Sequence, residues 1–300
     1  MNRSIDLHTH STASDGSMSP RELVRHAKES GLSAMAITDH DTIDGVEEAL
    51  DEGAKIGIEV IAGVEVSVDF EPEMHVLGYF FGDSYKNFVP ILKRLKISRD
   101  ERNPKMVEKL RSLGFDITME EVRAEAKGNI VARPHMASVL LKKGYVQSIR
   151  EAFDKYIAEG KPAFVKKEKM SPKECIEAIT KAGGIPVMAH PLFLNLPLDE
   201  LDKLVEDLVK AGLKGIETYY VEHTDEDIDN LLKVAAKHNI IPTGGSDFHG
   251  TFKPDINIGV GRGNLFVPYE VLDRLKEIKK RTHIKMGEVG ELILNNKKCM

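Results

Sequence analysis

The strongest constraint on the fold is an alternation of strand-like and helix-like segments along most of the chain. The helix-like segments are amphipathic, and two of them open on the capping boxes Ser19–Glu22 and Ser171–Glu174. Such alternation predicts a parallel sheet with helices outside it. Seven short apolar runs read as strands: residues 4–8, 34–38, 59–68, 75–81, 185–189, 214–220 and 240–244. Over 300 residues, this predicts an α/β barrel or near-barrel, with an open doubly wound sheet as the alternative.

The middle of the chain, residues 84–165, breaks the alternation and has an all-helical pattern. Thr118–Glu121 is a capping box, and Pro134 lies just inside a further helix start. We therefore expect one barrel built from residues 1–83 and 166–300, interrupted by a helical insertion. The insertion is expected to lie over the C-terminal face of the barrel and to contribute to substrate binding.

Charge and composition narrow the classes of partner. Lys and Arg number 42 against 48 Asp and Glu, a net charge of −6, which argues against stable binding of duplex DNA and leaves room for a small anionic substrate held by local basic groups. The N-terminal sequence lacks the apolar core of a signal peptide, and no run of about 18 apolar residues indicates a membrane span. Cys175 and Cys299 lie far apart in sequence, so no disulfide framework is expected. These features predict a reduced, cytoplasmic protein.

Side chains of the kinds that bind metals lie at the ends of the predicted strands. His8 and His10 close the first strand as a His-x-His pair, and residues i and i+2 of a strand point to the same side. Asp247 and His249 repeat this spacing after the last strand. In a parallel barrel the carboxyl ends of all strands meet at one face, where active sites form. The predicted metal ligands are His8, His10, Asp15, His40, Glu65, His75, His190, Asp247 and His249.

Any one histidine of this set could equally be a surface or capping residue, so the metal hypothesis depends on the set as a whole. Imidazoles and carboxylates without thiolates suit Zn, Fe or Mn. The set holds too many ligands for one tetrahedral ion, which takes about four. Two or three ions that share a carboxylate would use them all, hold phosphate oxygens and lower the pKa of a bound water. We expect three further histidines to be structural: His26, His238 and His283.

With these residues assembled, the chain resembles the PHP (polymerase and histidinol phosphatase) family of metal-dependent phosphoesterases. The matching segments span residues 6–250 and are DLHTHSTASDG, ITDHDT, GVEVS, HVLGYF, MAHP and GGSDFHG. The resemblance implies a distorted (β/α)7 barrel with a trinuclear metal centre. It also implies how the ligands divide: one site of His8, His10, Glu65 and Asp247, a second that shares Glu65 with His75 and His190, and a third of Asp15, His40 and His249. Asp39, beside His40 in its motif, is expected to hydrogen bond rather than to bind metal.

Two segments of the insertion narrow the resemblance. NIVARPHMASVLLKKGYV and EAFDKYIAEGKPAFV are similar to the branch that removes the 3′-phosphate from 3′,5′-nucleoside bisphosphates, whose members also act as 5′→3′ exonucleases on short RNA. The resemblance implies that Arg133 and His135 bind substrate phosphate. Their place at a predicted helix N-terminus agrees, because free N–H groups and the helix dipole favour anions there. The same pattern also fits a helix cap with a surface ion pair.

The residues and the resemblance together thus predict a metal-dependent phosphomonoesterase that acts on a nucleotide, removes the 3′-phosphate of 3′,5′-nucleoside bisphosphates and releases inorganic phosphate. It would use up to three divalent ions (Mn, Fe or Zn) and a metal-activated hydroxide, with no side-chain nucleophile. The alternatives are a 5′→3′ exoribonuclease on short oligonucleotides, a phosphatase like histidinol phosphatase, and a non-catalytic PHP module. Tyr219 and Tyr220 could stack a base or pack in the core. The basic stretch from Lys93 to Lys105 could be a solvated face or a guide for RNA.

Overall fold

The computed structural model describes residues 3–126, 131–166 and 168–281, so Cys299 and His283 lie outside the described residues. Its centre is an eight-stranded sheet in the order β7-β6-β5-β4-β3-β2-β1-β8. The strands are β1 (Ser4–Asp6), β2 (Ala34–Ile37), β3 (Glu59–Val68), β4 (Met74–Phe80), β5 (Ile185–Met188), β6 (Gly215–Tyr220), β7 (Ile241–Gly245) and β8 (Val267–Pro268).

The sheet is nearly closed into a barrel. Beside β1 and β7, the amide of Leu7 donates to the carbonyl of Gly244 at 3.2 Å, and the amide of Asp247 donates to the carbonyl of His8 at 2.9 Å. The close approach of β7 to the segment after β1 depends on Gly245, because a Cβ atom at this position would lie only 2.4 Å from the Cβ of His8. The α/β barrel predicted from the sequence is confirmed.

Strand β4 departs from the predicted parallel arrangement. It runs antiparallel to both β3 and β5, whereas β1 to β3 pair in parallel, as do β5 to β7. The connection at 69–73 is too short for the crossover that a parallel neighbour requires. Because β4 is reversed, its first residues lie at the edge of the barrel where β3 ends. His75 is consequently paired with Ser67, near the end of β3.

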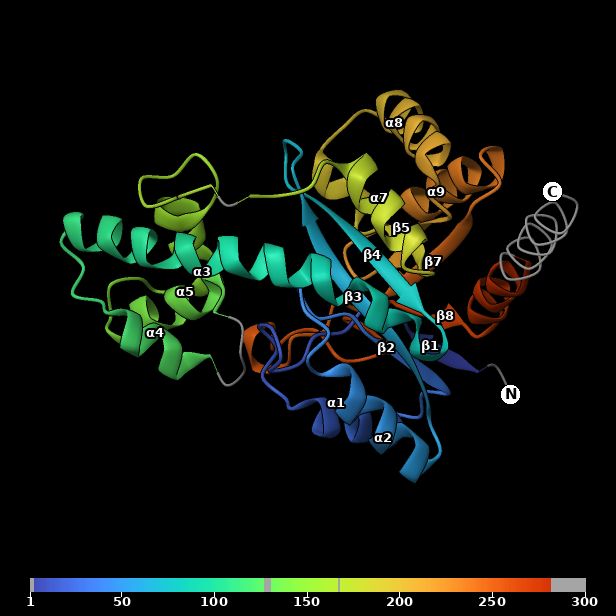
Figure 1. The fold of residues 1–300 in the computed structure, drawn as a ribbon, viewed down its shortest axis with the longest axis horizontal. Helices are drawn as coiled ribbons and strands as arrows, with labels where there is room; N and C mark the ends of the chain where they lie inside the picture. The colour runs from blue at the N-terminus through green and yellow to red at the C-terminus, as the bar shows by residue number, and fades with distance from the viewer. Residues whose placement is uncertain (1–2, 127–130, 167, 282–300) are drawn as a thin grey trace, which may run out of the picture.

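Helices cover both sides of the barrel. Figure 1 shows α1 and α2 on one side and α7, α8 and α9 on the other. The capping boxes predicted at Ser19 and Ser171 are both present. A further helical stretch runs over residues 270–281. The outer helices are α1 (Pro20–Glu29), α2 (Val46–Ile56), α7 (Pro172–Lys181), α8 (Leu198–Ala211) and α9 (Asp225–Lys237).

Alternation along the strands separates two hydrophobic clusters. In β2, Met35 and Ile37 belong to the cluster that joins the sheet to α1 and α2. Ala34 and Ala36 belong to a second cluster, formed by strand residues such as Ile5 and by the helical stretch at 270–281. Successive strand side chains point to opposite faces, so β2 places its large residues against the helices and its alanines inside the barrel.

The segment between β4 and β5 forms a group of helices with a hydrophobic cluster of its own. Leu92 and Leu95, in the first half of α3, belong to the cluster that joins the sheet to α1 and α2. Met106 and Leu110, in its second half, belong to the separate cluster of the helices between β4 and β5. Figure 1 shows α3 leading away from the barrel toward α4 and α5. This arrangement supports the division at residues 84–165, which stays a prediction. The elements are η1 (Gly82–Phe88), α3 (Val89–Ser112), α4 (Met119–Glu125), α5 (Arg133–Lys142), α6 (Ile149–Ala152) and the π-helical turn η2 (Phe153–Ile157).

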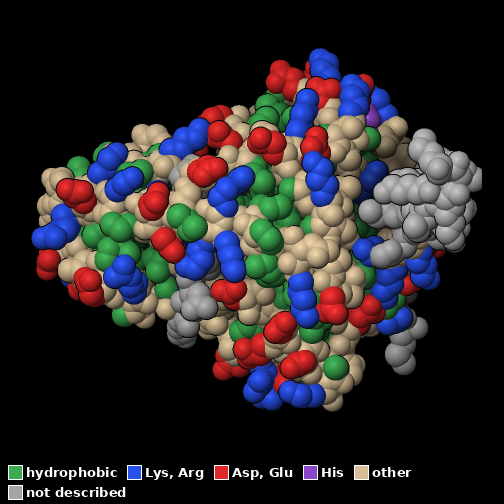
Figure 2. All heavy atoms as spheres, in the orientation of Figure 1, with side chains coloured by type: hydrophobic (Ala, Val, Ile, Leu, Met, Phe, Trp, Pro, Cys, Tyr) green, Lys and Arg blue, Asp and Glu red, His purple; other side chains and the backbone are tan. Residues whose placement is uncertain are grey.

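The surface carries charges of both signs. On the face seen in Figure 2, Lys and Arg side chains are interspersed with Asp and Glu. The described side chains of that face therefore form no continuous basic surface of the kind that duplex DNA requires. Within the described ranges, every helix is too short or too polar to cross a membrane.

Candidate metal centre

The nine predicted metal ligands gather at one end of the barrel. Glu65 lies in β3 and His75 in β4, whereas the other seven lie on loops that follow strands. Their side chains are between 0% and 17% exposed, so the cluster is almost wholly removed from bulk solvent. The structure therefore brings together all the residues that the sequence singled out, while their role as metal ligands stays a prediction.

Glu65 lies at the centre of the cluster. Its Oε1 atom is 2.7 Å from Nδ1 of His75 and 3.0 Å from Nε2 of His190. Its Oε2 atom lies 3.1–3.2 Å from a nitrogen of three further histidines: His40, His8 and His10. The two oxygens thus face different imidazoles, which is the arrangement expected of a carboxylate shared between two ions.

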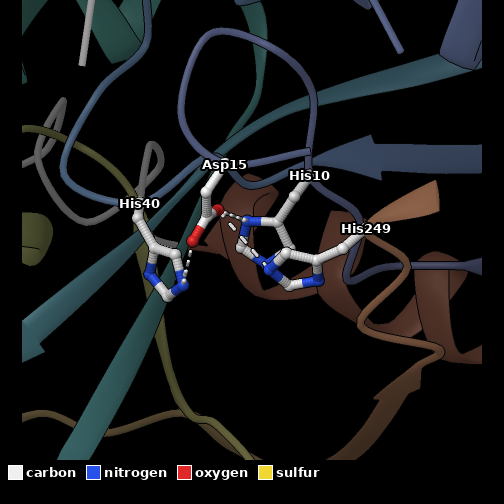
Figure 3. Close-up of side chains that lie close together, drawn as sticks. All are labelled: His10, Asp15, His40 and His249. Atoms are coloured by element: carbon white, nitrogen blue, oxygen red, sulfur yellow. Dashed lines mark ion pairs between the residues drawn. The ribbon is translucent and has the colours of Figure 1, made fainter. Parts of the chain in front are cut away.

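Asp15 forms a second centre. In Figure 3 its carboxylate points toward the imidazoles of His10, His40 and His249. Oδ1 is 3.4 Å from Nε2 of His249 and 3.8 Å from Nδ1 of His10, and Oδ2 is 3.9 Å from Nε2 of His40. These four residues come from the loops after β1, β2 and β7, so only the closed barrel can bring them together.

Three overlapping groups of side chains each have ligand atoms within 4.8 Å of one another. They are His8, His10, Glu65 and Asp247; His10, Asp15, His40 and His249; and His40, Glu65 and His75. The first has the membership that the family resemblance implies, and the second adds His10 to the implied set. The third group contains His40 in place of His190, which the resemblance implies as the partner of Glu65 and His75. The division among ions stays a prediction.

The donor set fits divalent cations. Six buried atoms of the cluster have no hydrogen-bond partner among the residues that the structure describes: His8 Nε2, His10 Nδ1 and Nε2, His40 Nδ1, Glu65 Oε2 and His75 Nε2. Buried polar atoms are nearly always hydrogen bonded, so such a concentration of unsatisfied atoms requires a cause. Cations provide one, because imidazole nitrogens and carboxylate oxygens that face a common point can ligate one ion at about 2.0–2.2 Å.

Carboxylates behind the cluster hold the ligands in place. Glu217 in β6 has Oε1 3.0 Å from Nδ1 of His8, and its Oε2 accepts from the amide of His190 at 2.7 Å. A proton held at Nδ1 leaves Nε2 of His8 as the lone pair that faces the cluster. Asp39 accepts bonds from the amide and hydroxyl of Ser11, both at 2.7 Å. The sequence analysis missed Glu217, although a lone carboxylate within the apolar segment GIETYY is a usable signal.

Asp247 is held from the side that faces away from the histidines. Its Oδ2 atom accepts from the hydroxyl of Tyr220 at 2.9 Å and from Nζ of Lys253 at 2.6 Å, and Oδ1 lies 3.2 Å from Nε2 of His10. Tyr220 is therefore a buried support for Asp247 and does not offer its ring to a base. Lys253 lies after β7 in a segment without periodicity, and no sequence signal identified it.

Two of the predicted ligands lie on strained backbone. Asp247 has φ 54° and His190 has φ 23°, both directly beyond buried strands. Positive φ is uncommon outside glycine, costs on the order of 1–3 kcal/mol, and is concentrated at functional sites. The strain turns each side chain back toward the cluster.

Metal affinity should rise between pH 7 and pH 9. Burial disfavours charge on His10, but the nearby carboxylates of Asp247 and Glu65 outweigh burial and raise its pKa to about 9. His75 is likewise buried, and the charge of Glu65 raises its pKa to about 9. In the metal-free protein both imidazoles are thus protonated at pH 7, and binding must release at least two protons per cluster. Titration calorimetry in buffers of different ionisation enthalpy measures this release, and an affinity independent of pH over this range would contradict it.

Comparison with known proteins decides the family. The family model described as the PHP domain matches residues 6–168, more than half of the chain. The chain belongs to the PHP family. It is 37% identical to a 5′-3′ exoribonuclease from Haemophilus influenzae, over 83% of this chain and 91% of that protein. It is 32% identical to a 3′,5′-nucleoside bisphosphate phosphatase from Chromobacterium violaceum, over 85% of this chain and 90% of that protein.

A solved PHP-like structure agrees in fold. A protein from Bifidobacterium adolescentis, named as a metal-dependent phosphoesterase, has a TM-score of 0.81 and 31% identity, covering 91% of this chain and 95% of that one. Together with the clustered ligands, these relatives make this PHP protein a metal-dependent phosphoesterase, and hence a hydrolase.

A cavity of about 990 Å³ opens onto the PHP metal cluster. Seven of the nine cluster residues line it, as does Lys253. Four more cations line it from α3, α5 and the segment before α7: Arg99, Arg102, Arg133 and Lys169. Arg99 and Arg102 are only 4% and 6% exposed, so these two residues of the basic stretch are turned inward, and for them the solvated face, one of the two alternatives, does not hold.

Arg133 is held beside the cluster. Its Nη2 donates to both carboxylate oxygens of Glu73 at 2.9–3.0 Å, and Oε1 of Glu73 lies 3.6 Å from Nε2 of His75. The rings of Phe153 and Phe164 flank the guanidinium with centroids at 5.5 and 5.9 Å. Arg133 lies at a helix start, as expected. Its ion pair with Glu73 lies in the wall of the cavity, whereas the alternative from the sequence was an ion pair on the surface.

His135 closes the first turn of α5. It is 2% exposed, and its Nδ1 accepts a hydrogen bond from the amide of Ala132 at 3.0 Å. Through this bond His135 caps the N-terminus of α5, and a helix cap is the alternative to phosphate binding that the sequence analysis left open. Contact between His135 and a substrate phosphate stays a prediction, and it would have to use Nε2.

Proposed function

We propose that this protein hydrolyses the 3′-phosphate of 3′,5′-nucleoside bisphosphates. The observation that carries the proposal is that one cavity holds both the metal cluster and a wall of cations. A substrate with a single phosphate would need only the cluster, whereas the wall suits a second phosphate on the same molecule. The phosphatase named above, 32% identical to this chain, supports the same substrate class.

We also propose that the cluster holds up to three divalent ions, of Mn, Fe or Zn. Nine predicted ligands exceed what one or two four-coordinate ions need, and eight of them, all but His190, fall in three overlapping groups. His10, His40 and Glu65 each belong to two groups and would be the residues that lie between neighbouring ions.

The side chains around the cavity have separate roles in this mechanism. When bound, the ions would supply Lewis-acid stabilisation of the phosphate and activation of water. Arg133 lines the cavity and would offer phosphate oxygens the N–H groups that do not bind Glu73, and Arg102 adds a second guanidinium. Lys253 and Tyr220 fix the carboxylate of Asp247 through Oδ2, which leaves Oδ1 for a cation. A cavity of about 990 Å³ is large enough to enclose a nucleotide.

A second candidate is 5′→3′ hydrolysis of short RNA. The relative from Haemophilus influenzae, 37% identical to this chain, is named for that activity. Both activities would use the same metal cluster, and the cation wall would then hold a phosphodiester of the chain instead of a terminal phosphate.

Phosphate release should depend wholly on bound metal. The assay compares 3′,5′-bisphosphates, 5′-mononucleotides, histidinol phosphate and short 5′-phosphorylated RNA, with and without Mn²⁺, while elemental analysis measures the bound ions. We expect the bisphosphates to react fastest, complete chelation to abolish the reaction, and Mn²⁺, Fe²⁺ or Zn²⁺ to restore it.

Each alternative has its own result in this assay. Faster reaction of RNA would establish the second candidate, and faster reaction of histidinol phosphate would place the protein with that phosphatase. Release that persists unchanged after chelation would refute the mechanism. The double variant His8→Ala/His10→Ala should lose metal and activity together, whereas a non-catalytic module would show no activity to lose.

A further inference from the structure

Phe193 presents an exposed aromatic ring beside the metal cluster. It lies in the short 3₁₀ helix η3 (Pro191–Leu194), three residues beyond His190. Its side chain is 41% exposed and lines the cavity. Among the large hydrophobic residues that are exposed in the described part of the chain, it alone contributes to this cavity.

The ring is held firmly by its neighbours. Its centroid is 4.6 Å from that of His190 with the planes tilted by 31°, and 5.6 Å from that of Tyr220 with the planes at 88°. The amide of Phe193 donates to the carbonyl of His190 at 3.1 Å, and the side-chain amide of Asn195 donates to the carbonyl of Phe193 at 3.1 Å. These contacts orient one part of the ring and leave the rest toward the cavity.

The other aromatic residues near the cavity are already engaged. Phe153 and Phe164 flank the guanidinium of Arg133. Tyr220 is 2% exposed, and its hydroxyl donates to Asp247. Of Tyr220 and Phe193, only Phe193 therefore has a ring that is exposed at the cavity.

We propose that Phe193 is the platform of a nucleobase subsite, on which the heteroaromatic base of the substrate stacks. This inference rests on the proposed function and adds the residue that recognises the base. His190, against which the ring packs, lies 3.0 Å from Glu65 at the centre of the cluster. A nucleobase and its 3′-phosphate are attached to the same furanose ring, so a phosphate at the cluster leaves the base close to this platform. Stacking accepts every base, so the subsite should discriminate little among them.

The kinetic test separates recognition of the base from support of His190. Phe193→Ala should raise KM for adenosine 3′,5′-bisphosphate about tenfold or more, with kcat little changed. KM for the abasic sugar 3′,5′-bisphosphate should stay the same. Phe193→Leu keeps an apolar contact with His190 without a planar ring, and it should behave like the alanine variant. An equal loss toward both substrates would overturn the proposal, because it would mean that Phe193 acts only through His190.

A fluorescence test needs no turnover. The chain contains no tryptophan, so Phe193→Trp introduces a single reporter at the platform. In the metal-loaded protein, the reaction product adenosine 5′-monophosphate should quench its emission saturably, and ribose 5-phosphate should not. Equal responses to both ligands, or none, would overturn the subsite. Saturable quenching in a protein that releases no phosphate from bisphosphates would instead leave the subsite standing and refute the proposed function.

Discussion

Replacing Glu65 by Gln should remove bound metal and nearly all phosphate release while leaving the fold intact. The two oxygens of Glu65 approach five histidines, and both lie within 3.2 Å of a ring nitrogen. Loss of an outer partner of a metal ligand typically costs about 10–100-fold, so loss of a carboxylate shared by two ligand groups should lower the rate by about 10³-fold. Elemental analysis of the purified variant, beside the phosphate assay, measures both effects.

The fold should survive because the cluster can adjust its charge. Glu65 favours the protonated forms of His8, His10 and His75, so its neutralisation lowers the pKa of each, and they lose protons instead of remaining as unpaired cations. Glu52→Gln is the matched control, since Glu52 is also buried but pairs with Arg25 at 2.6 Å on the outer helices. The control should keep its metal and rate. A Glu65→Gln protein that retains the same equivalents of metal would refute the central role of this carboxylate.

The gathering of the ligands could be predicted because it follows from the general geometry of barrels. Strand ends in a barrel converge on one face, so residues such as His8, His190 and Asp247 meet although they are far apart in the chain. The direction of β4 could not be read from its residues, because a short apolar run looks the same in either direction. The usable signals were the brief connection at 69–73 and the position of His75 at the start of its strand, opposite to the other histidines.

Arg133 of the cation wall was predicted from the sequence, but Arg99 and Arg102 could not be placed there, for a different reason. The basic residues between Lys93 and Lys105 were judged by composition, which favours a solvated face. Burial along α3 instead follows a helical stripe, and Arg99 and Arg102 occupy positions on it between Leu95 and Met106. Two arginines at positions where the periodicity calls for apolar side chains are themselves a signal of an internal anion site. Only the packing of α3 against the barrel shows which side of the helix is covered.

Arg99→Met and Arg102→Met should change the stability of the free protein in opposite directions. Both side chains lie on α3, three residues apart, and both are buried. Arg99 forms an ion pair with the buried carboxylate of Asp41, so its replacement breaks a buried ion pair and should cost about 3 kcal/mol. Among the described residues, the side chain of Arg102 has one hydrogen bond, from Nε to Oδ1 of Asn103 at 2.9 Å, and takes part in no ion pair. Burial, together with repulsion from Arg99 and Arg133, lowers the pKa of Arg102 to about 9.

A guanidinium buried in this way destabilises the free protein and is relieved when an anion arrives. Arg102→Met should therefore raise the thermal midpoint while raising KM for 3′,5′-bisphosphates by about 10–100-fold. Inorganic phosphate should stabilise the unsubstituted protein in thermal melts, and this gain should largely disappear in Arg102→Met. If Arg102→Met instead melts lower, as Arg99→Met should, then Arg102 supports the packing of α3 and does not bind phosphate. A cation that binds a substrate phosphate is expected to lower the stability of the free protein and to raise its affinity for the anion. Comparing Arg99→Met with Arg102→Met tests this expectation for two arginines of the same helix.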